Sequence, residues 1–170
     1  MVDYTITKLD ITNKGLTKLP DDIDKYTNLK TLNCWRNNIT SLDNLPPKLE
    51  ILRCDLNQLT NLDNLPPTLE KLYCRCNKIT SLDNLPNSQQ AGYEDKPLGL
   101  PPNLKELDCS YNNITSLDNL PPNLKELYCH WNYITSLDNL PTKLEDLNCV
   151  NNPLEYDFEH TLENIRNYNY

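Results

Sequence analysis

Cysteines are the residues of this 170-residue chain best suited to do chemistry, and there are seven of them. Six recur at one place in a repeated pattern, L-x-C-x-x-N: Cys34, Cys54, Cys74, Cys109, Cys129 and Cys149. Regularly spaced thiols can bind metal ions or exchange disulfides. The seventh, Cys76, lies outside the pattern between Arg75 and Lys78, and cationic neighbours make a thiol more reactive. A thiol or metal-binding protein is therefore one hypothesis.

The segments that carry these cysteines are near-copies of one another. The octapeptide ITSLDNLP occurs letter for letter at 39–46, 79–86, 114–121 and 134–141. Units of the form L-x-C-x-x-N-x-(I/L)-x-x-L begin at Leu32, Leu52, Leu72, Leu107 and Leu127, and degenerate units begin at Leu9 and Leu147. Most units are 20 residues apart, but Leu72 and Leu107 are separated by 35. This is the leucine-rich-repeat signature with cysteine in its third leucine position.

The repeat predicts a leucine-rich-repeat solenoid of the α/β horseshoe class. One unit cannot bury its own leucines, so the copies must stack until they share a core. We expect each L-x-C to form a short strand in a parallel sheet on the concave face, with leucine and cysteine inward. The prolines of L-D-N-L-P-P exclude a helix, so the convex side should be polyproline-like or 3₁₀.

Both ends of a solenoid need caps, because the outer repeats would otherwise expose leucine. Phe158, Leu162, Ile165 and Tyr168 have helical spacing, which predicts a capping helix over about 158–168. The longer first unit has room for one helical turn in LPDDIDKYTNLK. We predict a single domain, 1–170, divided into a cap and first repeat (1–31), repeats (32–85), an inserted loop (86–100), repeats (101–154) and a terminal cap (155–170).

The predicted sheet argues against chemistry at the regular cysteines. Neighbouring strands lie ~4.8 Å apart with parallel Cβ directions, whereas a disulfide needs Cβ atoms about 3.8 Å apart. Zinc needs ligands that converge from several directions, which a straight column does not supply. We therefore expect the six cysteines to be core and Cys76 to be either a reactive thiol or a tolerated substitution at the rim. The repeated asparagines should satisfy backbone groups where the strands turn.

Composition excludes several classes of function. The net charge of −8 argues against binding nucleic acid or an anionic membrane. The two histidines stand at no recognised spacing from a nucleophile, and three glycines provide no phosphate-binding loop. We expect no catalysis, no metal and no cofactor. The N-terminus has no apolar signal segment, and seven cysteines without one indicate reduced thiols in the cytoplasm.

The fuller pattern resembles known repeat families. LPPKLEILRCDLNQLTNL resembles the short leucine-rich repeats of bacterial secreted effectors. It is more similar still to leucine-rich-repeat proteins of amoeba-infecting giant viruses, and NPLEYDFEHTLENIRNYNY resembles their terminal cap. The resemblance covers roughly residues 9–170. It implies protein binding through the horseshoe and, for a viral protein, a place in the host-cell cytoplasm.

Differences between near-identical units point to a binding surface. The scaffold positions hardly change, while the outward positions vary and include Trp, Tyr and Arg, which often anchor interfaces. We predict these partner-binding residues: Trp35, Arg36, Arg53, Asp55, Tyr73, Arg75, Asp108, Tyr111, Tyr128, His130 and Trp131. Basic residues prevail in repeats two to four and acidic residues in repeats five to seven, which would orient a partner of opposite charge.

The sequence thus favours a monomeric, non-catalytic protein-binding module whose partner is a protein. Two alternatives stay open at this point. One is a thiol or metal-binding protein that uses the cysteine column and Cys76. The other is a structural repeat protein that associates with itself.

Overall fold

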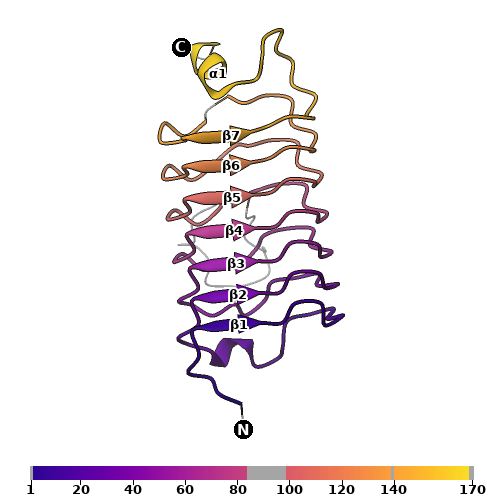
Figure 1. The fold of residues 1–170 in the computed structure, drawn as a ribbon, viewed down its shortest axis with the longest axis vertical. Coiled ribbons are helices and arrows are strands. Elements are labelled where there is room, and N and C mark those ends of the chain that lie inside the picture. The colour runs from indigo at the N-terminus through magenta and orange to yellow at the C-terminus, as the bar shows by residue number, and fades with distance from the viewer. Residues whose placement is uncertain (1, 84–98, 139, 169–170) are drawn as a thin grey trace, which may run out of the picture.

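The computed structural model describes residues 2–83, 99–138 and 140–168. All seven predicted units contribute to one continuous stack (Figure 1). The loop predicted at 86–100 lies, apart from its last two residues, outside the described residues.

Seven parallel strands form a single sheet in chain order (Figure 1). They are β1 (Lys8–Asp10), β2 (Thr31–Asn33), β3 (Ile51–Arg53), β4 (Lys71–Tyr73), β5 (Glu106–Asp108), β6 (Glu126–Tyr128) and β7 (Asp146–Asn148). Each central leucine pairs with the next, and Leu72 pairs with Leu107 across the 35-residue interval. The register therefore continues through the insertion, and the predicted leucine-rich-repeat solenoid is confirmed.

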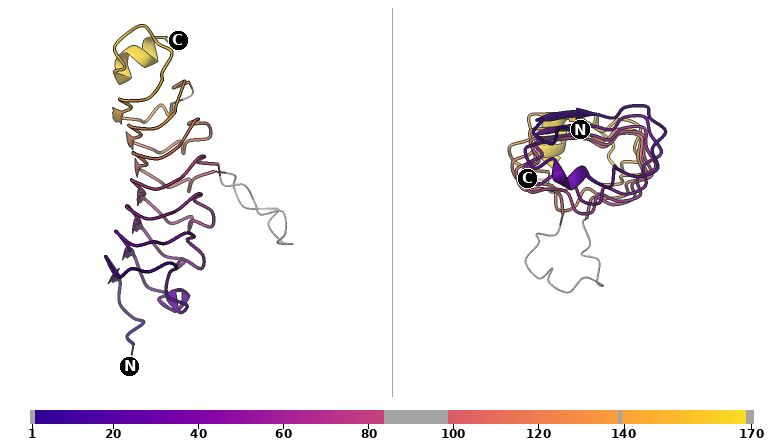
Figure 2. Two further views of the ribbon diagram at one scale, coloured as in Figure 1. Left: turned by 90° about the vertical axis from the view of Figure 1, so that its right-hand side faces the viewer. Right: turned by 90° about the horizontal axis from the view of Figure 1, so that it is seen from below.

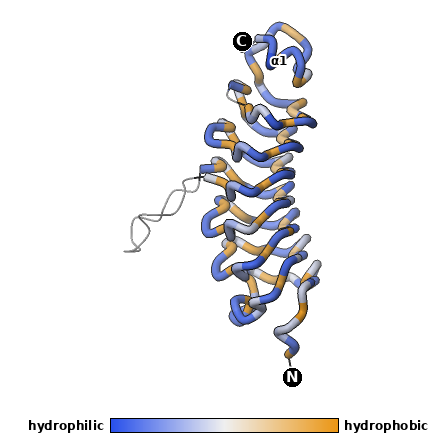
Figure 3. The backbone as a smooth tube through the Cα atoms, turned by 90° about the vertical axis from the view of Figure 1, so that its left-hand side faces the viewer, coloured by the Kyte–Doolittle hydropathy of each residue, from blue (hydrophilic) through white to orange (hydrophobic). Residues whose placement is uncertain are grey.

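In each inner strand only the central residue is buried in the core. Leu32, Leu52 and Leu72 are fully buried, while the residues on either side point outward. The leucines of the two outer strands, Leu9 and Leu147, are only partly buried. Figure 3 shows apolar and polar segments alternating along every turn of the chain, as expected when each repeat gives one row of side chains to a shared interior.

The return path behind the sheet consists of turns. In the second repeat the amide of Leu49 donates to the carbonyl of Pro46 at 3.3 Å, and the equivalent bond recurs in the later repeats. The 3₁₀ geometry predicted for the convex side occurs, within the described residues, as η1 (Ile23–Lys25). That is the segment of the long first unit in which a helical turn was predicted. Figure 2 shows each repeat as one turn of a flattened coil, with the strands on one side.

The two ends are closed by different means. At the N-terminus the rings of Tyr4 and Tyr26 meet edge to face at 5.0 Å. At the C-terminus, α1 (Leu162–Tyr168) covers the stack (Figure 1) and buries Ile165. This helix begins four residues later than predicted, because Phe158 precedes it and packs against other aromatic rings of the cap. Within the described ranges no helix has both the length and the apolar content needed to cross a bilayer.

Candidate functional site

The six regular cysteines form a buried column of free thiols. Their thiols point along the stack: the Sγ of Cys34 donates to the carbonyl of Arg53 at 3.4 Å, and Cys54 makes the same bond one repeat later. Burial raises the pKa of Cys34 to about 12 and that of Cys54 well above its usual value. These thiols therefore stay protonated at neutral pH and act as small apolar core residues, as predicted.

The described residues contain no group of three or more His, Cys, Asp or Glu that could hold a metal ion. Cys76 is set apart from the column, because it is partly exposed and lies in a turn. Its reactivity stays a prediction.

A column of asparagines secures the turn after each strand. The Nδ2 of Asn112 donates to the carbonyls of Cys74 and Cys109, both at 3.0 Å, and its Oδ1 accepts from the amide of Ile79 at 3.0 Å. Asn132 makes the equivalent three bonds one repeat later. The predicted role of the asparagines is therefore confirmed, and each one joins two successive repeats.

The residue just before each asparagine position forms a feature that the sequence did not reveal. Its backbone φ is positive, between 52° and 58°, in all seven repeats. We call this column the turn ridge; it comprises Asn13, Arg36, Leu56, Cys76, Tyr111, Trp131 and Asn151. Asparagine tolerates the left-handed region, but other non-glycine residues there cost about 1 kcal/mol. Both end repeats carry asparagine, and the five repeats between them carry other residues, of which all but Cys76 are larger than asparagine.

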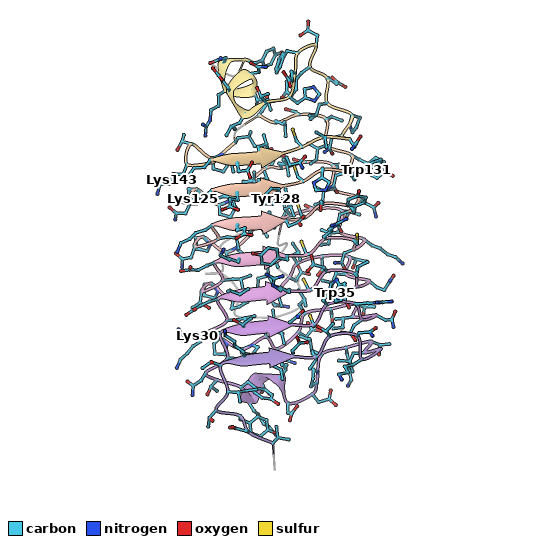
Figure 4. The ribbon with its side chains drawn as sticks, in the orientation of Figure 1. Lys30, Trp35, Lys125, Tyr128, Trp131 and Lys143 are labelled. Carbon is cyan, nitrogen blue, oxygen red and sulfur yellow. The ribbon has the colours of Figure 1, made fainter. Side chains whose placement is uncertain are left out.

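The predicted binding residues fall into two groups. Arg53, Tyr73, Asp108 and Tyr128 lie in strands, on the outward side that we call the strand face. The others lie beyond the strand ends. Arg36, Tyr111 and Trp131 belong to the turn ridge, and the residues that precede the ridge are Trp35, Asp55, Arg75 and His130. Figure 4 shows Tyr128 over the sheet and both tryptophans beyond the ends of the strands.

The basic and acidic halves of the strand face meet in one network. The guanidinium carbon of Arg53 lies 4.5 Å from the ring centre of Tyr73, whose hydroxyl donates to Glu106 at 2.6 Å. The ammonium of Lys71 also pairs with Glu106, at 2.5 Å. Burial alone would raise the pKa of Glu106, but the bonds from Lys71 and Tyr73 outweigh it and hold that pKa below its usual value. Part of the predicted charge gradient is thus neutralised between β4 and β5.

At the acidic end of the strand face, one hydroxyl lies between two carboxylates. Tyr128 donates towards Asp146 at 2.7 Å and lies 3.3 Å from Glu126. The hydrogen bond to Asp146 raises the pKa of the Tyr128 hydroxyl, which therefore stays neutral. No ion pair neutralises either carboxylate within the described residues. This end of the strand face keeps its negative charge.

Aromatic rings stack along the turn ridge. The guanidinium carbon of Arg75 lies 4.8 Å from the ring centre of Tyr111, and Tyr111 stacks on Trp131 with ring centres 5.5 Å apart and planes 20° from parallel. Trp131 is 50% exposed and Tyr111 39%. His130 meets the edge of Tyr111 at 5.4 Å, and burial lowers its pKa, so it is mainly neutral at pH 7.

The opposite end of the strands is organised by charge pairs. The residues immediately before β2 to β7 are charged, and neighbouring repeats form three ion pairs through them; we call this column the entry ladder. Its pairs are Lys30–Glu50 at 2.7 Å, Glu70–Lys105 at 2.9 Å and Lys125–Glu145 at 2.6 Å. Figure 4 shows Lys30 and Lys125 on the side of the sheet opposite to the tryptophans.

Comparison with known proteins supports the fold. The family model for leucine-rich repeats, in two copies, matches residues 102–142. A search of the curated proteins found no match to this chain.

Several solved structures share the architecture. The functional domain of InlJ from Listeria monocytogenes, which includes a cysteine ladder, is 35% identical with a TM-score of 0.69, over 91% of this chain and 33% of that one. YopM from Yersinia enterocolitica WA-314 is 33% identical with a TM-score of 0.63, over 91% of this chain and 35% of that one.

The leucine-rich-repeat domain of a Shigella effector is 30% identical with a TM-score of 0.60, over 89% of this chain and 52% of that one. The chain therefore spans about a third to a half of these proteins. The resemblance to effector repeats that the sequence suggested is supported.

Proposed function

We propose that the protein is a non-catalytic protein-binding module whose partner contacts the turn ridge and the adjoining strand face. The eleven residues predicted from the sequence supply the contacts, with the ridge aromatics as anchors. The proposal includes a monomeric protein in the cytoplasm, and in that of the host cell if the chain is viral, as its resemblance to giant-virus repeats implies.

One observation carries the proposal: bulky side chains occupy strained backbone positions where asparagine would be easier to accommodate. Asn13 and Asn151 sit at the same φ as Tyr111 and Trp131. The repeat therefore accepts asparagine at this position, yet the five middle repeats bear residues that cost about 1 kcal/mol each. Strain that persists without a structural need commonly marks a functional surface.

The dimensions of the surface are adequate for a specific interface. Seven strands at ~4.8 Å spacing give a face roughly 30 Å long, enough for about 800 Å² of contact per partner. Tyrosine, tryptophan and arginine, which recur on it, are the residues most often found as energetic anchors. The buried, protonated cysteines weigh against the alternative of a thiol or metal protein.

The test replaces ridge residues by the one that the ridge geometry favours. The triple variant Arg36→Asn, Tyr111→Asn and Trp131→Asn should stay folded, because each new asparagine relieves strain while the lost stacking costs about 1 kcal/mol. Its affinity for a partner captured from the source cell should fall by about 2 kcal/mol or more, roughly 30-fold.

A matched control changes three lysines at the other end of the strands, Lys30→Gln, Lys125→Gln and Lys143→Gln. This variant should bind the partner normally. A ridge variant that keeps its melting temperature and also binds normally would show that the partner contacts another surface.

A further inference from the structure

The aromatic stack of the turn ridge ends on Trp131, whose side chain is 50% exposed. Tyr111 covers one face of Trp131 from the preceding repeat, so the other face is directed towards the following repeat. The ridge residue there is Asn151. Across the described part of the chain, no second ring and no cationic group stacks on Trp131. A planar group from another molecule can therefore extend the stack.

Carboxylates lie on the strand face that precedes this ring: Glu126 opens β6, five residues before Trp131, and Asp146 opens β7. Glu126 and Asp146 share the hydroxyl of Tyr128 and lack an ion-pair partner in the described structure. Asp108, on β5, accepts a hydrogen bond from Ser110 at 2.5 Å. His130 meets the edge of Tyr111 at 5.4 Å and is mainly neutral because burial lowers its pKa. The guanidinium of Arg75 lies over Tyr111 and not over Trp131.

Lys71 and Lys125 are close enough for the charge of Glu126 to raise their pKa values, but in the described residues both lysines form their ion pairs with other carboxylates. A cation that arrives here can therefore pair directly with Glu126 and Asp146.

The protein itself shows which cation fits such a ring. It places a guanidinium over an aromatic ring twice, with Arg53 at 4.5 Å from Tyr73 and Arg75 at 4.8 Å from Tyr111. A guanidinium combines a flat face that stacks on a ring with donors that pair with carboxylates. A lysine ammonium offers a point charge without the flat face.

We propose that the partner presents a basic extended segment, with one arginine stacked on the open face of Trp131 and a second cation against Glu126 and Asp146. The inference rests on the proposed function and adds the chemistry of the partner. Trp131 follows Tyr128 by three residues and lies in the turn beyond β6. Two arginines four residues apart in an extended chain, about 14 Å, can span the two positions.

The probe is a ten-residue peptide that carries two arginines four residues apart among serines and threonines. Three matched peptides carry lysine, citrulline or glutamate in their place. The protein has two tryptophans, so Trp35→Phe leaves Trp131 as the sole indole emitter. Binding is followed by the emission of that tryptophan, and by polarisation of a labelled peptide for variants that lack it.

The arginine peptide should bind saturably, about threefold or more tightly than the lysine peptide and about tenfold more tightly than the citrulline peptide. Trp131→Asn should weaken it about tenfold. The pair Glu126→Gln and Asp146→Asn should do the same at low salt, with a smaller effect at 0.5 M NaCl.

The matched control is the pair Asp118→Asn and Asp138→Asn. It changes net charge equally, but it lies ten residues beyond β5 and β6, half a repeat away from the strand face. It should leave binding unchanged.

The inference is overturned if the arginine and lysine peptides bind equally, if Trp131→Asn binds the arginine peptide as the parent does, or if no peptide binds below 1 mM. The proposed function is tested separately. It fails if the captured partner binds the ridge triple variant as tightly as it binds the parent protein. If the captured partner needs the ridge but the arginine peptide does not bind, the proposed function stands and the arginine-rich partner is rejected.

Discussion

The two ends of the strands differ in how their exposed side chains are arranged. At the entry ladder, exposed side chains neutralise one another in ion pairs such as Lys30–Glu50 and Lys125–Glu145. At the turn ridge, exposed side chains are large and sit on strained backbone, as at Tyr111 and Trp131. Both columns belong to the same near-identical repeats, so the difference lies in the side chains that each repeat places there.

The turn ridge has more unused capacity for binding than the entry ladder. Polar groups that are already paired across repeats gain little from a partner, since they must first give up existing contacts. Exposed rings on a rigid turn lose little entropy on binding and bury apolar area. The entry ladder is thus suited to holding repeats together, and the turn ridge to meeting another molecule.

The largest expected effect is a loss of stability when an asparagine that secures the turn after a strand is replaced. Asn112→Ala removes the donors to two buried carbonyls and the acceptor for the amide of Ile79. Leaving these groups unpaired should cost about 3 kcal/mol, measured by urea unfolding. Its control at the entry side is Asn103→Ala, where an exposed amide bonds the carbonyl of Pro67 and the loss should be under about 1 kcal/mol. Equal losses would mean that both ends of the strands are held equally firmly.

The next largest expected effect is a gain in stability. Arg36→Asn should stabilise the protein by about 1 kcal/mol, because asparagine tolerates the positive φ of 56° that strains arginine. Lys48→Asn makes a comparable change on the entry side, at a residue without positive φ, and should bring no gain. Thermal unfolding compares the two variants. An unchanged or lower melting temperature for Arg36→Asn would show that the ridge backbone is not strained at this position.

The smallest effect is expected in the entry ladder. Lys125→Gln breaks the pair with Glu145, whose two side chains are 50% and 65% exposed, so the melting temperature should fall by no more than about 1 °C. The hydrogen bond to Glu145 raises the pKa of Lys125 in the folded state. The stability that the pair contributes is therefore present at neutral pH and disappears as the pH rises through that raised pKa.

Comparing wild type and variant at pH 7 and above the lysine pKa, with and without 0.5 M NaCl, checks this prediction. A difference that grows with pH or with salt would contradict it.

The repeat could be predicted from the sequence because each position has the same surroundings in every copy. Leu52, Cys54 and Asn57 face inward in one unit, so their counterparts face inward in the other units between the two ends. Side-chain contacts between copies could not be predicted in this way. Lys71 and Glu106 are 35 residues apart, and they meet because the register continues through the insertion.

The candidate site was predicted less well, for a local reason. The strands end after three residues, so several residues expected on the sheet face lie in turns. Their positive φ had a signal in the sequence, asparagine at 13 and 151. That signal occurs in the two degenerate end units, where the alignment of copies is weakest. The start of α1 was missed because Phe158 keeps helical spacing but packs within the preceding loop.

The strand spacing of the solenoid also limits the direction in which an extended partner can lie. Along the stack, side chains recur every ~4.8 Å, whereas an extended chain repeats its side chains on one face every ~6.8 Å. A segment that crosses the strands falls out of phase after one or two contacts. A segment that runs parallel to β6 has the same period as the strand beneath it and stays in phase. An extended partner of the kind proposed should therefore lie along the strands and not across them.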